Sequence, residues 1–287
     1  MTNSSRNFAL LIAVSLVLWW HPLSATLDLA LSREEFTHIL IILPISLTLI
    51  YLKRKESRLE GQGSFIAGSV VLLAALAILA FAKWGRAFED DERLSVVMFG
   101  LVTWLIVSVV LCFGTRTSRL LIFPLLFLFW IVPLPEVLLG RIVESLQDQS
   151  AFASRILFRM VGTPATQDGI MLSIPGLDIE VARQCSSIRS SMVLIVMTMF
   201  LAQLFLHSWW RKALLIAAAI PLSVIKNGLR IVVIGELATR VDMGYLDGNL
   251  HHHGGIVFLA VALLIVVCLM WLLMRGENSK GRLKASM

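Results

Sequence analysis

Charged residues are scarce in this chain of 287 residues. They make up 15% of it, whereas 57% of the residues are hydrophobic and the mean hydropathy is +0.83. A soluble domain usually carries about 25% charged residues. The shortage excludes an ordinary soluble protein and predicts an all-α protein that crosses the membrane several times. The net charge of +6 does not indicate nucleic-acid binding, because the basic residues gather in short segments between apolar runs, as in membrane proteins.

Cysteine is also rare. Three cysteines are too few and too scattered for a disulfide framework or a zinc site. Cys112 and Cys268 lie inside apolar runs, where a thiol is normally an inert small hydrophobic group. A small-residue cleavage site is missing after the first apolar run, so we expect that run to be retained as a span. Nothing in the sequence calls for a cofactor.

Apolar runs long enough to cross the membrane are abundant, since a helix needs about 20 residues to do so. We expect eight spans. Six are strong and two, both near the N-terminus, are interrupted by histidine, proline or aspartate. The strong spans are 65–83, 94–113, 119–139, 187–207, 211–235 and 255–274, and the interrupted ones are 8–30 and 36–52.

Lysine and arginine predict the orientation of these spans. An even number of spans leaves both termini on one side, and the short connections on that side hold most of the basic residues: Arg6, Lys53, Arg54, Lys55, Arg58, Arg116, Arg119, Arg211, Lys212, Arg275, Lys280, Arg282 and Lys284. The positive-inside rule therefore predicts cytoplasmic termini. The longest connection, about 140–186, then faces outward.

That connection has two predicted parts. In residues 141–160, "RIVESLQDQSAFASRILFRM", the apolar side chains alternate with charges in a way that suits an amphipathic helix on the membrane surface; they are Ile142, Leu146, Ala153, Ile156, Leu157 and Met160. The stretch "GIMLSIPGLDIEV" then predicts a short β-hairpin, because Pro175 and Gly176 suit the two central positions of a type II turn. The hairpin would lead the chain to Cys185 at the outer membrane surface.

Cys185 stands in "VARQCSSIRS", at the start of the sixth span. Unpaired backbone N–H groups and the helix dipole favour an anion there. Arg189 follows four residues later, so both side chains share one helix face. A cation and a helix N-terminus together favour the nucleophilic thiolate. The alternative is a boundary cysteine beside interfacial arginines.

The seventh span contains "IKNGLRIVVIGEL", with Lys226, Asn227 and Arg230 in an otherwise apolar helix. An ionisable residue inside a span is costly and indicates function. Lys226 and Arg230 are four residues apart and share a face, which disfavours a simple lipid-facing position. Snorkelling to the interface, or a structural pair of either residue with Glu236 or Asp178, remains the alternative.

The last span follows "DGNLHHHGGIVF". Histidine exchanges protons near neutral pH, and three in a row turn at least one toward the protein. Consecutive helical residues point about 100° apart, so three in a row seldom converge on one metal ion; an ordinary polar loop is the other alternative. Cys185, Arg230 and the histidines all fall at outer ends of consecutive spans. Together they supply the nucleophile, oxyanion stabiliser and proton carrier that acyl transfer through a thioester requires.

"CSSIRS", "NGLRIV" and a His–Gly motif before the last span, in this order, resemble the exosortases and archaeosortases. The resemblance covers roughly Pro124 to Trp271. It implies a membrane cysteine protease or transpeptidase that cleaves the C-terminal sorting signal of exported proteins, which consists of a PEP-CTERM-like motif, an apolar span and a basic tail. It also implies transfer of the new carboxyl end to an acceptor at the cell surface, such as an exopolysaccharide or a lipid. The setting would be the outer, periplasmic face of a bacterial inner membrane.

Carried over by motif, the family cysteine matches Cys185 and the family arginine matches Arg230. The family histidine, four residues before a glycine, selects His251, while His252 and His253 stay open as supporting residues. Arg189 and Asn227 would support the site or bind substrate. Ser187 stands where the family commonly has glycine, which together with the triple histidine suggests a divergent subgroup.

The resemblance also suggests a domain layout. We expect one integral membrane domain, 1–287, with N-terminal spans at 1–118, an exosortase-like catalytic core at 119–275 and a cytoplasmic tail at 276–287. The competing hypothesis is a multi-span transporter or a protein that handles glycan-lipids, in which Lys226 and Arg230 bind an anionic head group.

Overall fold

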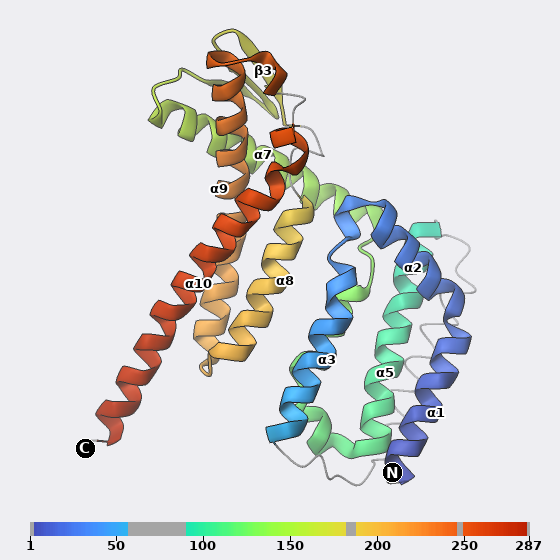
Figure 1. The fold of residues 1–287 in the computed structure, drawn as a ribbon. Helices are drawn as coiled ribbons and strands as arrows, with labels where there is room; N and C mark the ends of the chain where they lie inside the picture. Colours follow the sequence, from blue (N-terminus) through green and yellow to red (C-terminus); the bar gives the residue numbers. More distant parts are fainter. Residues whose placement is uncertain (1–2, 57–89, 182–187, 246–248, 286–287) are drawn as a thin grey trace. The chain divides into compact units, whose positions relative to one another are not determined.

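The computed structural model describes residues 3–56, 90–181, 188–245 and 249–285; at 3, 56, 90–91, 245, 249–254 and 277–285 it describes the backbone alone. The chain forms two compact units, Met1–Leu139 and Gly140–Met287, coloured blue to green and green to red in Figure 1. The prediction of a single integral membrane domain stays a prediction.

The first unit is helical throughout its described part. Its elements are α1 (Asn3–Leu18), α2 (Trp20–Ser32), η1 (Glu34–Phe36), α3 (Ile39–Glu56), α5 (Asp90–Leu120), α6 (Ile122–Phe127) and η2 (Leu128–Ile131). Trp19, at the break between α1 and α2, is 4% exposed and donates its indole N–H to the carbonyl of Val97 at 3.1 Å. Ser46 similarly donates to the carbonyl of Pro124 at 2.8 Å, which joins α3 to α6.

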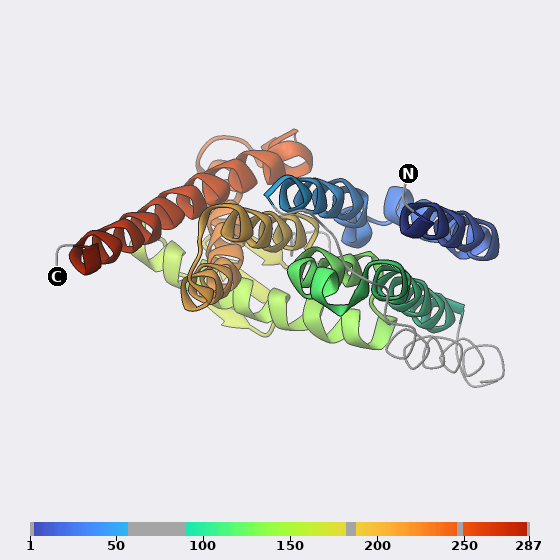
Figure 2. The same cartoon turned by 90° about the horizontal axis from the view of Figure 1, so that it is seen from below.

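The second unit contains a three-helix bundle and a small sheet. Its elements are α7 (Glu136–Met160), β1 (Thr166–Asp168), β2 (Met171–Ile174), β3 (Leu177–Glu180), α8 (Ile188–Phe205), α9 (Trp209–Arg240), η4 (Met243–Tyr245) and α10 (Asn249–Ala285). Figures 1 and 2 show α8, α9 and α10 side by side. Their shared core includes Leu194, Leu215 and Val266.

The all-α polytopic membrane fold is confirmed, but the count of eight spans is not. In the described part, five helices are long and apolar enough to cross a membrane, or up to seven if each bent pair counts as one span. The predicted spans 8–30 and 119–139 correspond to the bent pairs, with bends of 70° and 92°. At the second bend Pro133 and Pro135 lack the N–H groups that would continue the helix. The predicted span 65–83 lies outside the described residues.

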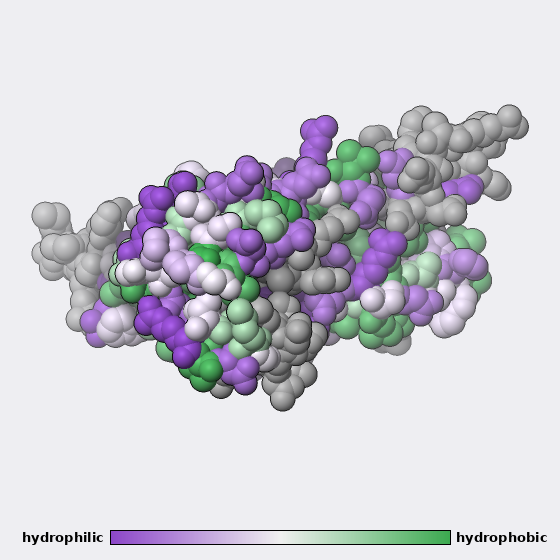
Figure 3. Space-filling view, turned by 90° about the horizontal axis from the view of Figure 1, so that it is seen from above, coloured by the Kyte–Doolittle hydropathy of each residue, from purple (hydrophilic) through white to green (hydrophobic). Residues whose placement is uncertain are grey.

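The predicted hairpin is confirmed as β2 and β3, and β1 adds a third strand that the sequence pattern did not indicate. The strands pair antiparallel, with Leu172 opposite Ile179. One face of the sheet is apolar and packs against α7 and α9 in a core with Phe158, Ile231 and Val232. Its other face is exposed and polar; Figure 3, which looks onto this end of the molecule, shows mainly hydrophilic and intermediate side chains there.

The predicted amphipathic helix is also confirmed, as α7. Ile156 and Met160 are exposed, whereas the buried face is partly polar. Its members recur at helical spacing and are Val143, Gln147, Ser150, Ala151, Ser154 and Phe158. Exposed apolar residues on α7 are compatible with a face turned toward the membrane, whereas the buried polar residues bind groups on neighbouring segments of the protein. A position on the membrane surface stays a prediction.

Gly176 fixes the turn of the hairpin with φ +84°, a conformation that L side chains rarely adopt. We expect Gly176→Ala to lower the unfolding free energy by about 1–2 kcal/mol, the cost of a Cβ in left-handed backbone. Thermal unfolding of the full chain in detergent measures this. The control is Gly140→Ala in helix α7, where a Cβ meets nothing within 4 Å and alanine is the better helix former. Equal effects of the two substitutions would contradict the explanation.

Candidate active site

Helix α9 is long enough to pack in two different environments along its length. Its 32 residues measure about 48 Å, more than the roughly 30 Å of a hydrocarbon core. The first part packs in the bundle with α8 and α10. From Asn227 onward the helix contacts α7, and from Ile231 onward it also packs against the sheet. Arg230 stands where one environment changes to the other.

The polar residues of α9 face the protein interior. Lys226, Asn227 and Arg230 are only 5%, 1% and 8% exposed. Lys226 donates from its Nζ to Ser190 Oγ in the first turn of α8. Snorkelling to the membrane interface is therefore wrong for Lys226. Of the proposed structural partners, Glu236 accepts from Arg240 Nε at 2.7 Å and from the Thr163 hydroxyl, and Asp178 is exposed.

Two lysines define how α9 runs along α8. Lys226 reaches Ser190 at one end of the pair, and Lys212 donates from its Nζ to Gln203 Oε1 at 2.7 Å toward the other end. A spacing of fourteen positions along α9 thus runs opposite a spacing of thirteen along α8, in antiparallel register. This register determines the level of every α9 side chain relative to the start of α8.

The Asn–Gly pair of the "NGLR" motif has a structural role between α9 and α7. Asn227 Nδ2 donates to Ser150 Oγ at 2.9 Å. A Cβ on Gly228 would lie 3.0 Å from the Cβ of Ala153 and 3.2 Å from the backbone nitrogen of Ser154. Ser154 Oγ lies 3.4 Å from the carbonyl oxygen of Gly228. A side chain on residue 228 would require the neighbouring backbone of α7 to move by a few tenths of an ångström.

Helix α7 also binds the chain just before the cysteine motif. Gln147 Nε2 donates to the carbonyl of Val181 at 2.7 Å, and both residues are buried. The Val181 N–H donates to the carbonyl of Ile170 at 3.0 Å. Gln147, Ser150 and Ser154 were missed as site residues. Their spacing of three and four on a helix is the signal that could have found them.

The structure describes only some of the predicted site residues in full. Cys185 lies outside the described residues. His251, His252 and His253 fall in the first turns of α10, which begins at Asn249, and their side chains also lie outside the description. Arg189 is exposed on the first turn of α8. Asn227 and Arg230 are both buried. They belong to a group of buried polar residues, called the polar layer below, which consists of Gln147, Ser150, Ser190, Lys226, Asn227 and Arg230.

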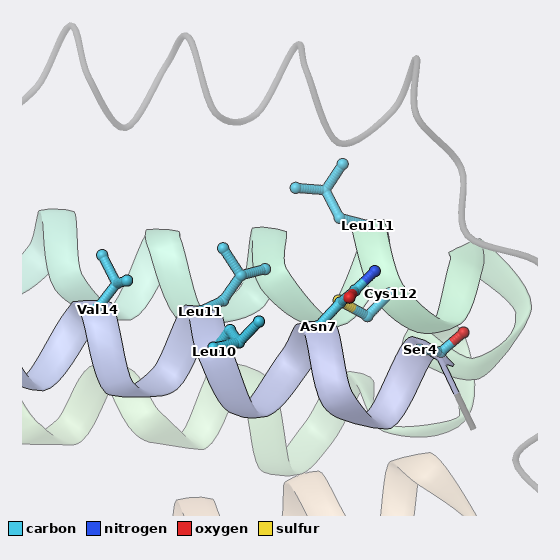
Figure 4. A pocket seen from close by; sticks show the side chains of 7 residues that line it. All are labelled: Ser4, Asn7, Leu10, Leu11, Val14, Leu111 and Cys112. Carbon is cyan, nitrogen blue, oxygen red and sulfur yellow. The ribbon is translucent and has the colours of Figure 1, made fainter. Parts of the chain in front are cut away.

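A cavity of about 480 Å³ lies elsewhere, between α1 and α5 (Figure 4). Hydrocarbon side chains line most of it, with Ser4, Asn7 and Cys112 near one end. None of the predicted site residues contributes to its wall. The cavity is therefore not the candidate site.

The sequence model of the transmembrane exosortases matches residues 19–268. The chain belongs to the transmembrane exosortase family. Comparisons with curated proteins and with solved structures give no match. The family supports a general role as a membrane transpeptidase that processes exported proteins carrying sorting signals. With its apolar helices, this exosortase is an integral membrane protein.

We expect the Asn227–Ser150 contact to stabilise this exosortase. Asn227→Ala, Ser150→Ala and the double variant should give a coupling energy of about 1 kcal/mol, typical of a hydrogen bond between protein groups. Unfolding of the full chain in detergent measures it. Gln149 and Ser145 form the control cycle, because Gln149 Nε2 donates to Ser145 Oγ at 2.8 Å on the exposed side of α7, where water competes for the groups. Coupling no larger in the buried pair than in the exposed pair would contradict the expectation.

Proposed function

We propose that this exosortase cleaves the C-terminal sorting signal of exported proteins through a thioacyl intermediate on Cys185. The Cys185 thiolate attacks the scissile carbonyl carbon, the C–N bond breaks, and the departing amine takes a proton from His251. A nucleophile of the acceptor then attacks the thioester and gives its proton to the same imidazole. This step releases the transferred protein and returns the thiolate.

The α8–α9 register is the observation that carries this proposal. It pairs Lys212 with Gln203 and Lys226 with Ser190. On α9, Arg230 lies one turn beyond Lys226, so the register sets Arg230 beyond the level of Ser190, in the direction of the residues that precede α8 in the sequence. Chain connectivity agrees, since the three residues from Cys185 to Ile188 span at most about 11 Å.

Arg230 suits the role of oxyanion stabiliser. Its side chain is only 8% exposed, and a fixed cation acts most strongly where water is excluded. Its guanidinium carries several donors in a planar fork that can bind a developing oxyanion. Arg189, which is exposed and follows Cys185 by four residues in the sequence, would support the thiolate or bind a substrate carboxylate. Asn227 would support the site by positioning, through its contact with Ser150.

We assign the substrate as an exported protein with a short PEP-CTERM-like motif, an apolar span and a basic tail. Its span would enter the bilayer laterally beside the last helices. The acceptor would be a surface exopolysaccharide or lipid. The polar end of the second unit would face the periplasm of a bacterial inner membrane. Arg211, Lys212 and Arg275 lie at the opposite end with Trp209, Trp210 and Trp271, which is typical of a cytoplasmic interface.

The transporter hypothesis receives less support. It requires Lys226 and Arg230 to meet a lipid head group, whereas both side chains are buried and Lys226 bonds to Ser190. A carrier of anionic lipid would need its cations on a surface that lipid can reach. The two hypotheses also differ in what they require of the cysteine.

Cys185→Ala should abolish processing of such an exported protein, because no other thiol would replace the nucleophile. The measurement is the mass of the co-expressed protein, which should lose its C-terminal tail only with the active enzyme. Cys268→Ala is the control, since this exposed thiol lies on α10. Arg230→Ala should also prevent processing. Processing of the exported protein by Cys185→Ala would refute the cysteine mechanism. Loss of function in Arg230→Ala, with Cys185→Ala unaffected, would favour the transporter hypothesis.

The three histidines allow the proton carrier to be identified. With the wild-type enzyme, kcat/KM should change with pH around the pKa of an imidazole, about 6.5. We expect His251→Gln to remove this change. His252→Gln and His253→Gln should keep it, because consecutive helical residues point in different directions. The measurement is kcat/KM against pH in liposomes. A profile unchanged by His251→Gln would remove this residue from the mechanism.

A further inference from the structure

We propose that the C-terminal half of α7 binds anionic phospholipids of the outer leaflet. Phe152, Ile156 and Met160, called the α7 stripe below, enter the acyl chains, while Arg155 and Arg159 contact the phosphates. The sequence pattern predicted a helix on the membrane surface, and the inference adds the lipid class and the residues that bind it. It takes from the proposed function only the outward direction of this end of the second unit.

The α7 stripe is an exposed apolar surface on one side of the helix. Its three members follow one another at intervals of four residues, which places them on one helix face. They are 51%, 42% and 76% exposed. Single apolar residues on a surface are ordinary, but several large ones that adjoin one another indicate a contact with lipid or with another molecule.

Two arginines border the α7 stripe, and neither has an acidic partner in the part of the chain that the structure describes. The guanidinium of Arg155 lies 5.1 Å from the centre of the Phe152 ring, and its Nε is buried without a hydrogen-bond partner there. Arg159 is exposed and makes one long contact, 3.5 Å, with the carbonyl of Ala165. Guanidinium groups bind phosphate through several donors in a planar fork. The pair therefore suits a phosphate.

The length of α9 gives the level at which α7 lies. Trp209 and Trp210 stand at the inner end of α9, and tryptophan is typical of a membrane interface. A helix that starts there and crosses about 30 Å, at about 1.5 Å per residue, reaches the outer boundary about 20 residues later. That position is near Arg230. A tilt of about 20° moves it by only one or two residues.

Helix α7 crosses α9 at this level (Figure 1). A Cβ on Gly228 would lie 3.0 Å from the Cβ of Ala153, and a Cβ on Gly235 would lie 2.9 Å from the ring of Phe158. The contact thus extends from about 3 Å inside the boundary to about 8 Å outside it. An amphipathic helix at a membrane surface buries its apolar face by about 5–10 Å. The α7 stripe lies beside this contact, within reach of the acyl chains.

The sheet shows which side of α7 is turned toward the bilayer. Phe158 packs in the core that α7 shares with the sheet, which adjoins the outer end of α9. At about 100° per residue, the members of the α7 stripe point about 120–160° away from Phe158. Arg155 and Arg159 point only about 60–100° away from it. The α7 stripe is therefore turned away from the sheet and toward the acyl chains, and the arginines occupy the level between, where the phosphates lie.

An acidic sorting motif is the other partner that two arginines could bind. A peptide carboxylate would neutralise the cations but leave the apolar side chains beside them in water. A phospholipid supplies a phosphate for the arginines and acyl chains for the α7 stripe at the same time. The combination of both features on one helix face therefore favours lipid.

The depth of the α7 stripe is measured with a nitroxide label. The full chain with Cys112→Ala, Cys185→Ala and Cys268→Ser carries Ile156→Cys as its only thiol, in liposomes of phosphatidylcholine with about 30% phosphatidylglycerol. Oxygen concentrates among acyl chains, whereas a polar nickel complex stays in water. We expect the ratio of oxygen to nickel accessibility at this label to be at least about threefold higher than at a label on the sheet side of α7.

Glu144→Cys provides that matched label, because Glu144 is exposed on the same helix and points only about 40° away from Phe158. If Ile156→Cys does not fold, Met160→Cys labels the most exposed member of the α7 stripe. Equal accessibility ratios at the two faces would overturn the proposal.

The lipid class is tested by thermal unfolding of the full chain in nanodiscs. Phosphatidylglycerol should raise the midpoint by about 2–4 °C over phosphatidylcholine alone, because a ligand of the folded state stabilises it. Arg155→Gln combined with Arg159→Gln should remove about half of this rise or more, and basic residues at the inner end account for the remainder. Arg240→Gln is the control and should keep the rise, since Arg240 is already paired with Glu236 at 2.7 Å. A loss of stability that is equal in both lipids does not affect this difference.

The outcomes separate this inference from the proposed function. A full rise in the variant that lacks both arginines would overturn lipid binding. A full rise together with a higher KM for the exported protein would assign the arginines to the acidic motif instead. Neither measurement uses the reaction, so processing that survives Cys185→Ala would overturn the proposed function and leave the result for α7 standing.

Discussion

The crossing of α7 over α9 is the contact on which the second unit depends. The helices approach closely at Gly228, where a Cβ would lie 3.0 Å from the Cβ of Ala153 and would force the two helices slightly apart. Because the backbones meet there, Asn227 can reach Ser150, and the sheet can pack on Phe158 and Ile231. The position of Arg230 follows from the same crossing, since it is two residues from the contact.

Burying polar groups beside this crossing is costly unless they find partners, because an amide or hydroxyl removed from water without a hydrogen bond costs roughly 1–3 kcal/mol. Most of the layer meets that requirement, through Gln147 with Val181, Asn227 with Ser150 and Lys226 with Ser190. Asn227 Oδ1 is an exception within the described residues. Hydrogen bonds require particular directions between donor and acceptor. The polar layer therefore favours one arrangement of α7, α8 and α9, where apolar packing would permit several.

The candidate site was only partly predictable, and particular residues show why. Lys226, Asn227 and Arg230 were recognisable because charges and amides are rare inside an apolar span. Gln147, Ser150 and Ser154 were not, because such residues are ordinary in a helix expected to lie at a membrane surface. Ser150 and Ser154 meet α9 residues more than 70 positions away in the sequence, and Gln147 meets Val181, 34 positions away.

The sequence by itself determined the membrane class, the helical character, the β2–β3 hairpin and the order of the motifs. Each of these depends on composition, or on residues close together in the chain: apolar length for the spans, and Pro175–Gly176 for the turn. Only the tertiary structure decided which face of α7 is buried, that β1 joins the sheet, and that the 119–139 run bends. It also decided that Lys226 faces Ser190 rather than lipid. These outcomes depend on contacts between distant segments, and periodicity along one helix carries no information about the partner that the helix will meet.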